Sequence, residues 1–377
     1  MDYRAPYPGN FICSLNKLED EIKEDGGTIV YVFTECDLNA NWIRQFMQEK
    51  EFVYVLSTNK WKSLFQLKNL IQKHHVNIVH SHFVGCFYQL PVNYLKKIFR
   101  KKIVMVRHLH NQYPIKSRVI EFIQKLLMPS DIIIGCSLPI AEDYIECKMN
   151  NSNVVYSIPN AIQFERLDTY EILKKEDFDI DQNSHVFLIF GFDFYRKGVD
   201  LAVLAMRNLI SKGENVVLMI SVAVNQFYVK DEILKILQCD EIPLWIRFIE
   251  PRNDIATYYR LCNTFVSPSR SEGLCYSLVE AAYCGCKLIA SNCIGQNLQI
   301  PHKLTFESEN LEEFEQKCKY VLQPVGAENE TQRIQEQKDV VIQQFQLSVW
   351  AKRVVWVYQN IGKKSKHIID LEKENIA

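Results

Sequence analysis

The segment SPSRSEGLCYSLVEAA, residues 267–282, decides the fold of this chain because it joins a predicted strand to a predicted helix. Residues 263–266 (NTFV) predict the strand before it, and residues 287–291 (KLIAS) predict a second strand after the helix. Four apolar side chains recur at helical spacing and predict the core-facing side of the helix: Leu274, Leu278, Ala281 and Ala282. A strand, a helix and a strand in this order form a βαβ unit, which predicts a parallel sheet.

Two carboxylates in this segment predict a ligand site. Glu272 falls in the turn, and Glu280 is expected about two turns into the helix. The loop after the first strand of a βαβ unit leads into a helix N-terminus, whose free N–H groups favour a phosphate. Acids beside a phosphate need hydroxyl partners, which the sugar and the ribose of a nucleotide sugar supply. The alternative is that both are exposed acids near a helix start, where Asp and Glu are common.

Length and composition indicate a soluble globular enzyme of two domains. The 377 residues exceed a single domain of about 150 residues, and 47% hydrophobic and 24% charged residues argue against disorder. The net charge of −1 excludes a polyanion binder at the level of the whole molecule. The twelve cysteines form no C-x-x-C pair, so we expect free thiols in a reducing cytoplasm. No apolar run approaches the roughly 18 residues of a membrane span, so membrane contact is expected only at the surface.

Apolar runs alternate with helical patterns along the whole chain and predict two α/β halves. The first half has predicted strands at residues 28–33, 52–56, 76–80, 103–108, 132–136 and 154–158. The second has them at residues 186–192, 216–220, 246–249, 264–267 and 287–291. Residues 163–184 are polar and predict a connection with a short helix, and residues 343–361 carry an apolar stripe that predicts a long helix. We therefore expect an N-terminal domain over 1–162, completed by a helix at about 345–377, and a C-terminal domain over 163–344.

Six landmarks in order along the chain resemble the family 4 glycosyltransferases of the GT-B type. They are PGN at 8–10, IVHSH at 78–82, His110-Asn111, IPNA at 158–161, RKG at 196–198, and the pair Glu272 and Glu280. The resemblance covers nearly the whole chain. It implies two Rossmann-like domains facing each other across a cleft, with the C-terminal helix crossing back to the N-terminal domain, and a retaining transfer of sugar from a nucleotide-sugar donor.

The resemblance also implies roles for individual residues. Glu272 would contact the hydroxyls of the donor sugar and Glu280 the ribose, Arg196 and Lys197 would hold the diphosphate, and His110 would lie near the reacting sugar. The remaining donor contacts would come from the backbone and small side chains of Gly9, Gly191, Gly273, Leu274 and Cys275. We expect no metal and no other cofactor, because the two cations and helix-start N–H groups can carry the charge of the diphosphate.

The chemistry of the residues agrees with these roles. Breaking a glycosyl phosphate bond builds negative charge on the leaving diphosphate, which preorganised cations stabilise. Arg196 and Lys197 follow a buried-looking strand and precede a predicted helix, so they belong to the strand-end loops where open α/β sheets bind ligands. Plainer alternatives stay open: a basic pair on a solvated loop, a turn glycine at Gly9 and a structural histidine at His110. For His80 and His82, which alternate along one strand, core packing is the favoured interpretation.

Three features depart from the family pattern. Phe192 stands where an arginine usually follows the glycine that matches Gly191, Cys275 stands where a second glycine is usual, and little apolar sequence precedes Pro6. Arg196 is a candidate substitute for the missing arginine. The departures support a second hypothesis, a catalytically impaired GT-B subunit that binds a partner or glycan. A third is a GT-B sugar-nucleotide epimerase or a sugar-phosphate-forming synthase, which would need a soluble small acceptor.

Nine basic residues against one acid, Glu121, mark the stretch from residue 91 to residue 125. The nine are Lys96, Lys97, Arg100, Lys101, Lys102, Arg107, Lys116, Arg118 and Lys125. Leu95, Ile98 and Phe99 follow helical spacing among them, as in a helix at a membrane surface. The alternative is an amphipathic helix packed on the N-terminal sheet.

We expect a cytoplasmic enzyme, peripheral at the inner face of a bacterial cell membrane, with a lipid-linked or growing surface glycan as acceptor and no nucleic-acid partner.

Overall fold

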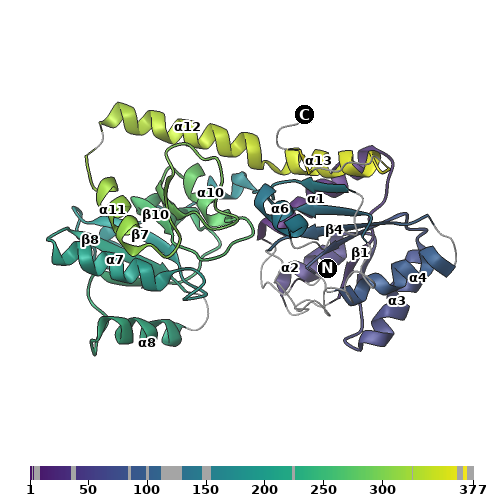
Figure 1. The fold of residues 1–377 in the computed structure, drawn as a ribbon, viewed down its shortest axis with the longest axis horizontal. Coiled ribbons are helices and arrows are strands. Elements are labelled where there is room, and N and C mark those ends of the chain that lie inside the picture. The colour runs from purple at the N-terminus through teal and green to yellow at the C-terminus, as the bar shows by residue number, and fades with distance from the viewer. Residues whose placement is uncertain are drawn as a thin grey trace. The chain divides into compact units, whose positions relative to one another are not determined.

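The computed structural model forms two compact units, residues 1–162 together with 345–377 and residues 163–344 (Figure 1). It describes residues 1, 3, 9–34, 40–83, 86–98, 102–111, 130–146, 154–222, 226–324, 326–362 and 368–371. Pro8, Phe99, Arg100, Lys101, Lys116, Arg118, Glu121 and Lys125, which the sequence singled out, lie outside the described residues. No helix in the described part of the chain combines the length and the apolar composition needed to cross a membrane.

The first unit is built on a parallel sheet with the strand order β13-β6-β5-β4-β3. Its strands are β3 (Ile78–His82), β4 (Val104–Leu109), β5 (Ile132–Gly135), β6 (Val154–Ser157) and β13 (Ile369–Asp370). A separate parallel pair consists of β1 (Tyr31–Phe33) and β2 (Val53–Val55). Residue Met1 extends the edge of this pair, because its amino group donates to Val32 O at 2.7 Å and its carbonyl accepts from Thr34 N at 2.7 Å.

The helices of the first unit cover its sheets. They are α1 (Gly9–Glu24), α2 (Asn41–Glu49), α3 (Lys60–Lys73), η1 (Cys86–Gln89), α4 (Leu90–Ile98), α6 (Leu138–Glu146) and α13 (Leu347–Gln359). The predicted apolar stripe is confirmed at Trp350 and Val354, which are buried in one cluster with Phe11 of α1 and Ile134 of β5. The single helix predicted over residues 343–361 is wrong, because one helix ends at Phe345 and α13 begins at Leu347. The C-terminal helix therefore completes the core of the N-terminal half (Figure 1).

The second unit is a six-stranded parallel sheet with the order β12-β11-β10-β7-β8-β9. The strands are β7 (His185–Phe190), β8 (Val216–Ser221), β9 (Ile246–Ile249), β10 (Thr264–Ser267), β11 (Lys287–Ser291) and β12 (Leu304–Phe306). The helices are η2 (Phe164–Leu167), η3 (Lys175–Phe178), α7 (Val199–Ser211), α8 (Gln226–Leu237), α9 (Ala256–Leu261), α10 (Tyr276–Tyr283), α11 (Leu311–Val321) and α12 (Ala327–Phe345). This is the Rossmann strand order. All strands are parallel, and successive strands are added on one side of the boundary between β7 and β10 in the first half of this unit and on the other side in the second half.

The βαβ unit predicted around residues 267–282 is confirmed. Strand β10 pairs in parallel with β11 on one side and β7 on the other, and α10 connects β10 to β11. The expected core-facing side of the helix is buried: Leu274, Leu278, Ala281 and Ala282. The position of Glu280 was predicted wrongly, because α10 begins only at Tyr276, so Glu280 lies just over one turn into the helix.

Candidate active site

The loops that follow β7, β10 and β11 meet at the carboxyl edge of the second sheet. Strands β7 and β10 are the neighbours on either side of the point where the strand order reverses. Open α/β sheets bind ligands in the crevice outside the carboxyl ends of the strands at such a switch point. The loop at residues 191–198 carries Arg196 and Lys197, and the loop at residues 268–275 carries Glu272.

A glycine allows these two loops to touch. Gly198 has φ +69°, and a Cβ on it would lie 2.0 Å from Pro268 O, so no other residue fits without moving the backbone. Arg270 N then donates to Arg196 O at 2.8 Å. The Arg270 guanidinium also donates to both carboxylate oxygens of Asp200, in the first turn of α7, at 2.9 and 2.8 Å. The loop that carries the cations is thereby fixed against the loop that carries the acid.

A second glycine holds the acid from the other side. Gly295, after β11, has φ +83°, and a Cβ on it would lie 2.4 Å from Glu272 O. The backbone N–H of Glu272 donates to Ile294 O at 3.2 Å, and that of Cys275 donates to Gly295 O at 3.3 Å. Glu272 and the start of α10 therefore rest on a loop that the sequence did not mark.

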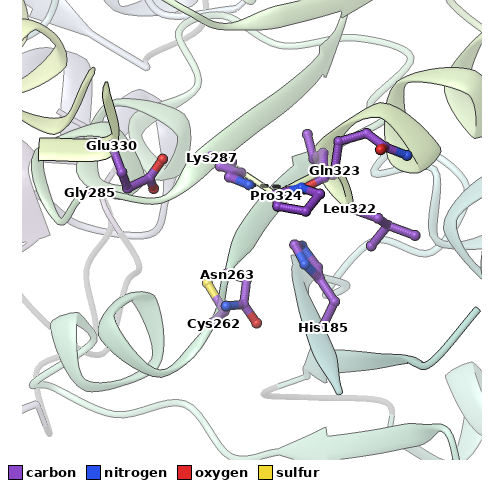
Figure 2. Close-up of a pocket in the computed structure, with 10 residues that line it drawn as sticks. His185, Cys262, Asn263, Gly285, Lys287, Leu322, Gln323, Pro324 and Glu330 are labelled. Carbon is purple, nitrogen blue, oxygen red and sulfur yellow. Dashed lines mark hydrogen bonds between the residues drawn. The ribbon is translucent and has the colours of Figure 1, made fainter. Parts of the chain in front are cut away.

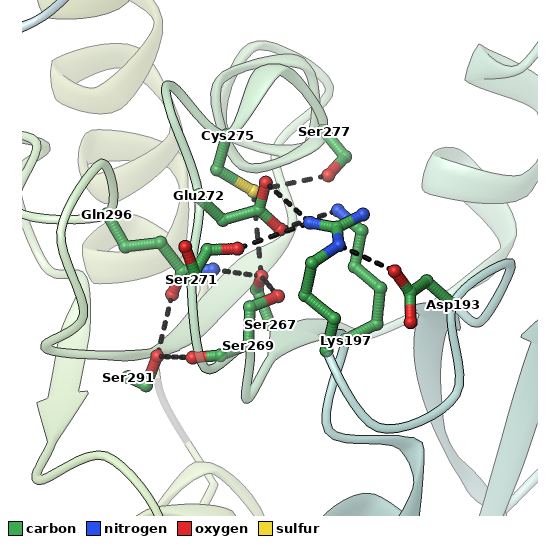
Figure 3. Close-up of polar contacts among 11 residues, drawn as sticks. Asp193, Lys197, Ser267, Ser269, Ser271, Glu272, Cys275, Ser277, Ser291 and Gln296 are labelled. Atoms are coloured by element: carbon green, nitrogen blue, oxygen red, sulfur yellow. Dashed lines mark hydrogen bonds and ion pairs between the residues drawn. The ribbon is translucent and has the colours of Figure 1, made fainter. Parts of the chain in front are cut away.

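Two cations share the carboxylate of Glu272 (Figure 3). Lys197 Nζ donates to Glu272 Oε1 at 2.6 Å, and Arg196 Nη1 lies 3.5 Å from Glu272 Oε2. The side chains of Lys197 and Glu272 are only 10% and 9% exposed. Arg196 also donates to Ser271 O at 3.2 Å and to Asp193 Oδ2 at 2.8 Å. The arrangement orients two positive groups toward one point at the carboxyl edge of the sheet.

Phe192, in the position where an arginine was expected, supports these cations. The residue is 53% exposed. The Nζ of Lys197 lies 4.8 Å from the ring centroid, and Cζ of Arg196 lies 5.4 Å from it. Both distances are within the range of cation–π attraction. Phe192 therefore does not add a charge here, but it helps to orient the two charges that are present.

Cys275, the other departure, is buried at the N-cap of α10. Its Sγ lies 3.5 Å from Ser267 Oγ and 3.4 Å from Ser277 Oγ. Burial, and to a smaller degree the charge of Glu272, raises the pKa of this thiol, so it is neutral. Cys275 thus belongs to the floor of the site and is not a nucleophile.

A buried polar network lies beneath the same loops, and sequence reasoning missed it. Gln296 is fully buried, donates to Ser267 Oγ and accepts from Ser291 Oγ at 3.2 Å. Ser291 Oγ is also close enough, at 2.5 Å, to donate to Ser269 O (Figure 3). These residues come from the ends of two strands, and only the folded sheet brings them together.

Glu280 has its own partners in the second unit. It is buried, pairs with the guanidinium of Arg166 from η2, and accepts from Tyr259 Oη at 3.1 Å. Arg166 and Tyr259 are the other two members of this group, and no sequence motif marked them. Glu280 is therefore held in place by two side-chain donors.

Gly191 and Gly273, two further glycines that the sequence singled out, are buried in the second unit. Gly191 follows β7, donates its N–H to Ser221 O at 2.9 Å, and would place a Cβ 2.9 Å from Ile220 Cγ2. Gly273 lies in the Glu272 loop, and Leu274 next to it is buried.

His110 and Gly9 lie in the first unit. Gly9 begins α1 with φ +55°, and the ring of Phe11, two residues later, lies 5.6 Å from the ring of His110. His110 is half-buried, with Nε2 3.0 Å from His82 Nδ1 and Nδ1 3.3 Å from Asn160 Nδ2. Burial lowers the pKa of His110 to about 3, so the imidazole is neutral. It can form hydrogen bonds, but it cannot supply a positive charge at neutral pH.

A separate pocket of about 330 Å³ opens at the opposite edge of the second sheet (Figure 2). Its lining includes the amino ends of three strands, represented by His185, Asn263 and Lys287. Lys287 Nζ donates to Val321 O at 2.9 Å, and His185 Nε2 is hydrogen-bonded to Thr264 Oγ1 at 2.8 Å. Because ligands bind at carboxyl ends in such sheets, we do not assign the donor to this pocket.

Two family profiles match the chain, one on each half. The family described as Glycosyltransferase Family 4 matches residues 27–166, and the family described as Glycosyl transferases group 1 matches residues 171–338. The second match contains Arg196, Lys197, Glu272 and Glu280. No curated protein matches the chain by sequence.

Solved structures share the fold at low sequence identity. A glycosyltransferase from Rickettsia africae is 16% identical with a TM-score of 0.77, covering 95% of this chain and 96% of that one. Anabaena Alr3699/HepE in complex with UDP is 14% identical with a TM-score of 0.73, covering 95% and 100%. Sucrose-phosphate synthase from Thermosynechococcus elongatus is 14% identical with a TM-score of 0.70, covering 95% and 94%.

Proposed function

Because the chain belongs to the GT-B glycosyltransferases of the family 4 type and is a nucleotide-sugar-dependent glycosyltransferase, we propose that it transfers a hexosyl group from a UDP-sugar to an acceptor hydroxyl with retention at the anomeric carbon. The choice of UDP is supported by Anabaena Alr3699/HepE, which was solved with UDP, with UDP and glucose, and with UDP-glucose. Retention follows from the family resemblance.

The group formed by Lys197, Arg196 and Glu272 carries the proposal. When the donor binds, its diphosphate takes the place of the Glu272 carboxylate beside the two cations. Glu272 is then released to accept hydrogen bonds from hydroxyls of the donor sugar, which are strong because the acceptor is charged. As the glycosyl bond breaks, charge grows on the leaving diphosphate, and the preorganised cations stabilise it. This chemistry needs no metal at the diphosphate, and we propose none there.

Two further contacts with the donor are part of the proposal. We assign the ribose hydroxyls to Glu280, whose carboxylate is oriented by Arg166 and Tyr259. We assign to His110 a hydrogen bond near the reacting sugar, made by a neutral imidazole because burial lowers its pKa to about 3. The backbones of Gly9, Gly191, Gly273, Leu274 and Cys275 remain the proposed close contacts to the donor.

For the acceptor we propose a lipid-linked or growing bacterial surface glycan, of the capsule, exopolysaccharide or lipopolysaccharide kind.

Contact of the enzyme with an anionic membrane would be made by basic side chains alone. The apolar side of α4 is used for packing, since Val92 and Leu95 are buried in a cluster with Met105, and Lys96 pairs with Asp131 at 2.6 Å. Lys97 and Lys102 are exposed, and each cation near an anionic surface contributes about 1 kcal/mol.

Release of UDP from UDP-sugars distinguishes an active transferase from a binding-only subunit. A thermal-shift screen of nucleoside diphosphates and their sugars comes first, because a ligand at 100 times its Kd adds about 2.7 kcal/mol of stability. The selected donor is then incubated with the protein and a set of acceptors, and UDP formation is followed. If the donor binds but no UDP forms with any of the acceptors, the catalytically impaired subunit that Phe192 and Cys275 suggest is favoured. UDP release with a free sugar phosphate as acceptor would favour the synthase alternative.

A further inference from the structure

Four histidines gather on one face of the first sheet. His80 and His82 lie on β3, His108 lies on β4 and His110 follows it, and in the parallel register His82 is beside His108. Alternate residues of a strand point to the same face, which places all four rings together. The ring centroids are 4.2 Å apart for His80 and His82, 5.1 Å for His82 and His108, and 4.5 Å for His108 and His110.

Three of the eight ring nitrogens of these histidines are buried without a hydrogen-bond partner among the described residues. His82 and His108 are only 2% and 3% exposed. Among the described residues, both nitrogens of His108 and Nε2 of His80 are buried with no partner. Buried polar groups in proteins are nearly always paired, so three unpaired nitrogens in one cluster require an explanation. Burial also lowers the pKa of each of these imidazoles and keeps them neutral, which is the form that binds metals.

We propose that His80, His82 and His108 bind one divalent transition-metal ion of the Zn²⁺ class. One ring nitrogen from each lies within 4.8 Å of those of the other two. A tetrahedral ion with Zn–N bonds of about 2.0 Å needs nitrogens about 3.3 Å apart, so small rotations of the rings close the site. Three neutral imidazoles favour Zn²⁺, Cu²⁺ or Ni²⁺ over the oxygen-binding ions Mg²⁺ and Ca²⁺.

The surroundings of the cluster match the outer contacts of histidine metal sites. A ligating histidine usually offers its second nitrogen to a hydrogen-bond partner that fixes the ring. His80 Nδ1 lies 2.5 Å from Tyr358 Oη, and His82 Nδ1 lies 3.0 Å from His110 Nε2. With the ion on Nε2, both Nδ1 atoms carry protons and donate to these partners. His110 Nε2 then accepts from His82, so the proton of His110 is on Nδ1. The Asn160 amide has to turn so that its Oδ1 accepts this proton, because the Nδ2 atom that lies 3.3 Å from His110 Nδ1 can only donate.

The ion would connect three parts of the first unit. Its ligands come from the neighbouring strands β3 and β4, and Tyr358 belongs to α13, the helix that completes this core. A metal there stabilises the folded unit, because the unfolded chain has no preformed site. The proposal does not rest on the diphosphate contacts, which we place in the second unit and assign to Lys197 and Arg196 without a metal.

The test uses the full chain without a histidine tag. The protein is stripped with a chelator, dialysed against micromolar Zn²⁺, and its metal content is measured by mass spectrometry. In parallel, Co²⁺ is titrated in and the visible d–d absorption of four-coordinate Co²⁺ is recorded. The variants are His80→Gln and His108→Gln, with His185→Gln as a partly buried control and His302→Gln as an exposed control, since both lie outside the cluster.

We expect about one Zn²⁺ per chain and a Co²⁺ band in the parent and both controls, and loss of both signals in His80→Gln and His108→Gln. Tyr358→Phe should keep the site and weaken metal affinity roughly 10- to 100-fold. If the cluster variants do not fold, the metal content and the Co²⁺ spectrum of the parent protein decide the outcome. Less than a tenth of an ion per parent chain with no Co²⁺ band overturns the proposal, and so does retention that is unchanged in folded His80→Gln and His108→Gln.

Discussion

Replacing Glu272 by Gln should affect binding of UDP and use of the UDP-sugar in opposite directions. In the protein without donor, the Glu272 carboxylate neutralises Lys197 and contacts Arg196. The diphosphate of UDP has to compete with this carboxylate, so Glu272→Gln removes the competitor and should tighten UDP binding. The donor sugar, by contrast, loses the charged acceptor that we assign to its hydroxyls, so transfer should become slower.

The geometry sets the size of both effects. Lys197 Nζ and Glu272 Oε1 are 2.6 Å apart, and Arg196 adds a second contact at 3.5 Å. Relief of this competition should tighten UDP binding by at least about 1 kcal/mol, roughly fivefold, because that is the upper value for an exposed ion pair and this pair is buried. Loss of charge-assisted hydrogen bonds to the sugar should cost about 1.5–3 kcal/mol, so kcat/KM should fall roughly 10- to 150-fold.

The assay combines calorimetry of UDP binding with kinetics on the UDP-sugar that the screen selects. Glu309→Gln is the matched control, because Glu309 pairs with Arg270 in the same region and its side chain is 67% exposed. Circular dichroism confirms that each variant is folded. The reasoning is refuted if Glu272→Gln weakens UDP and leaves kcat/KM unchanged, since that pattern would mean that the carboxylate serves the diphosphate side and never meets the sugar.

Four further outcomes are expected. Arg196→Ala and Lys197→Ala should each lower kcat more than they raise KM for the donor, because their contacts strengthen as charge develops; wild-type turnover in both would exclude the assignment. Glu280→Gln should weaken UDP by about 1.5–3 kcal/mol and leave pyrophosphate unaffected, whereas equal losses would argue against a ribose contact. Burial lowers the pKa of His185 to about 4 from about 6.5. As the pH is lowered, this histidine is therefore protonated in the unfolded chain before it is protonated in the folded protein. The free energy of unfolding should then decrease by up to about 1.4 kcal/mol per pH unit as the pH falls from 6.5 to 4. Urea titrations of the parent and His185→Gln should differ in this slope, and parallel curves would contradict it. Sedimentation with anionic vesicles at low salt should be lost when Lys96, Lys97, Arg100, Lys101 and Lys102 become Gln, and equal sedimentation would exclude a role for these cations.

Most of the sheet could be predicted because its strands are continuous apolar runs. The bounds of β9, β10 and β11 agree with the predicted residues, and the other predicted strands are shifted by a few residues. Two strands were missed because they are short and lack such a run, β12 (LTF) and β13 (ID). The 19-residue helix α12 was missed because its sequence is mainly polar and shows no apolar stripe.

The candidate site was predictable only where it depends on loop position. Lys197 and Glu272 were expected at strand ends, and the structure brings them to 2.6 Å although 75 residues separate them. Gln296, Arg166 and Tyr259 carry no local signal, because their positions depend on strand order and packing. The same holds for the histidine cluster: alternation predicted that His80 and His82 share a face, but only the register of β3 and β4 brings His108 between them and His110.

Calorimetry of UDP binding to two lysine variants tests most directly where the donor binds. Lys197→Met removes a cation at the carboxyl edge of the second sheet, and Lys287→Met removes one from the pocket at the amino edge. We expect Lys197→Met to weaken UDP at least about tenfold, which is ~1.4 kcal/mol, and Lys287→Met to bind UDP like the parent. The opposite result, with UDP lost in Lys287→Met and retained in Lys197→Met, would contradict a donor site formed by Arg196, Lys197 and Glu272.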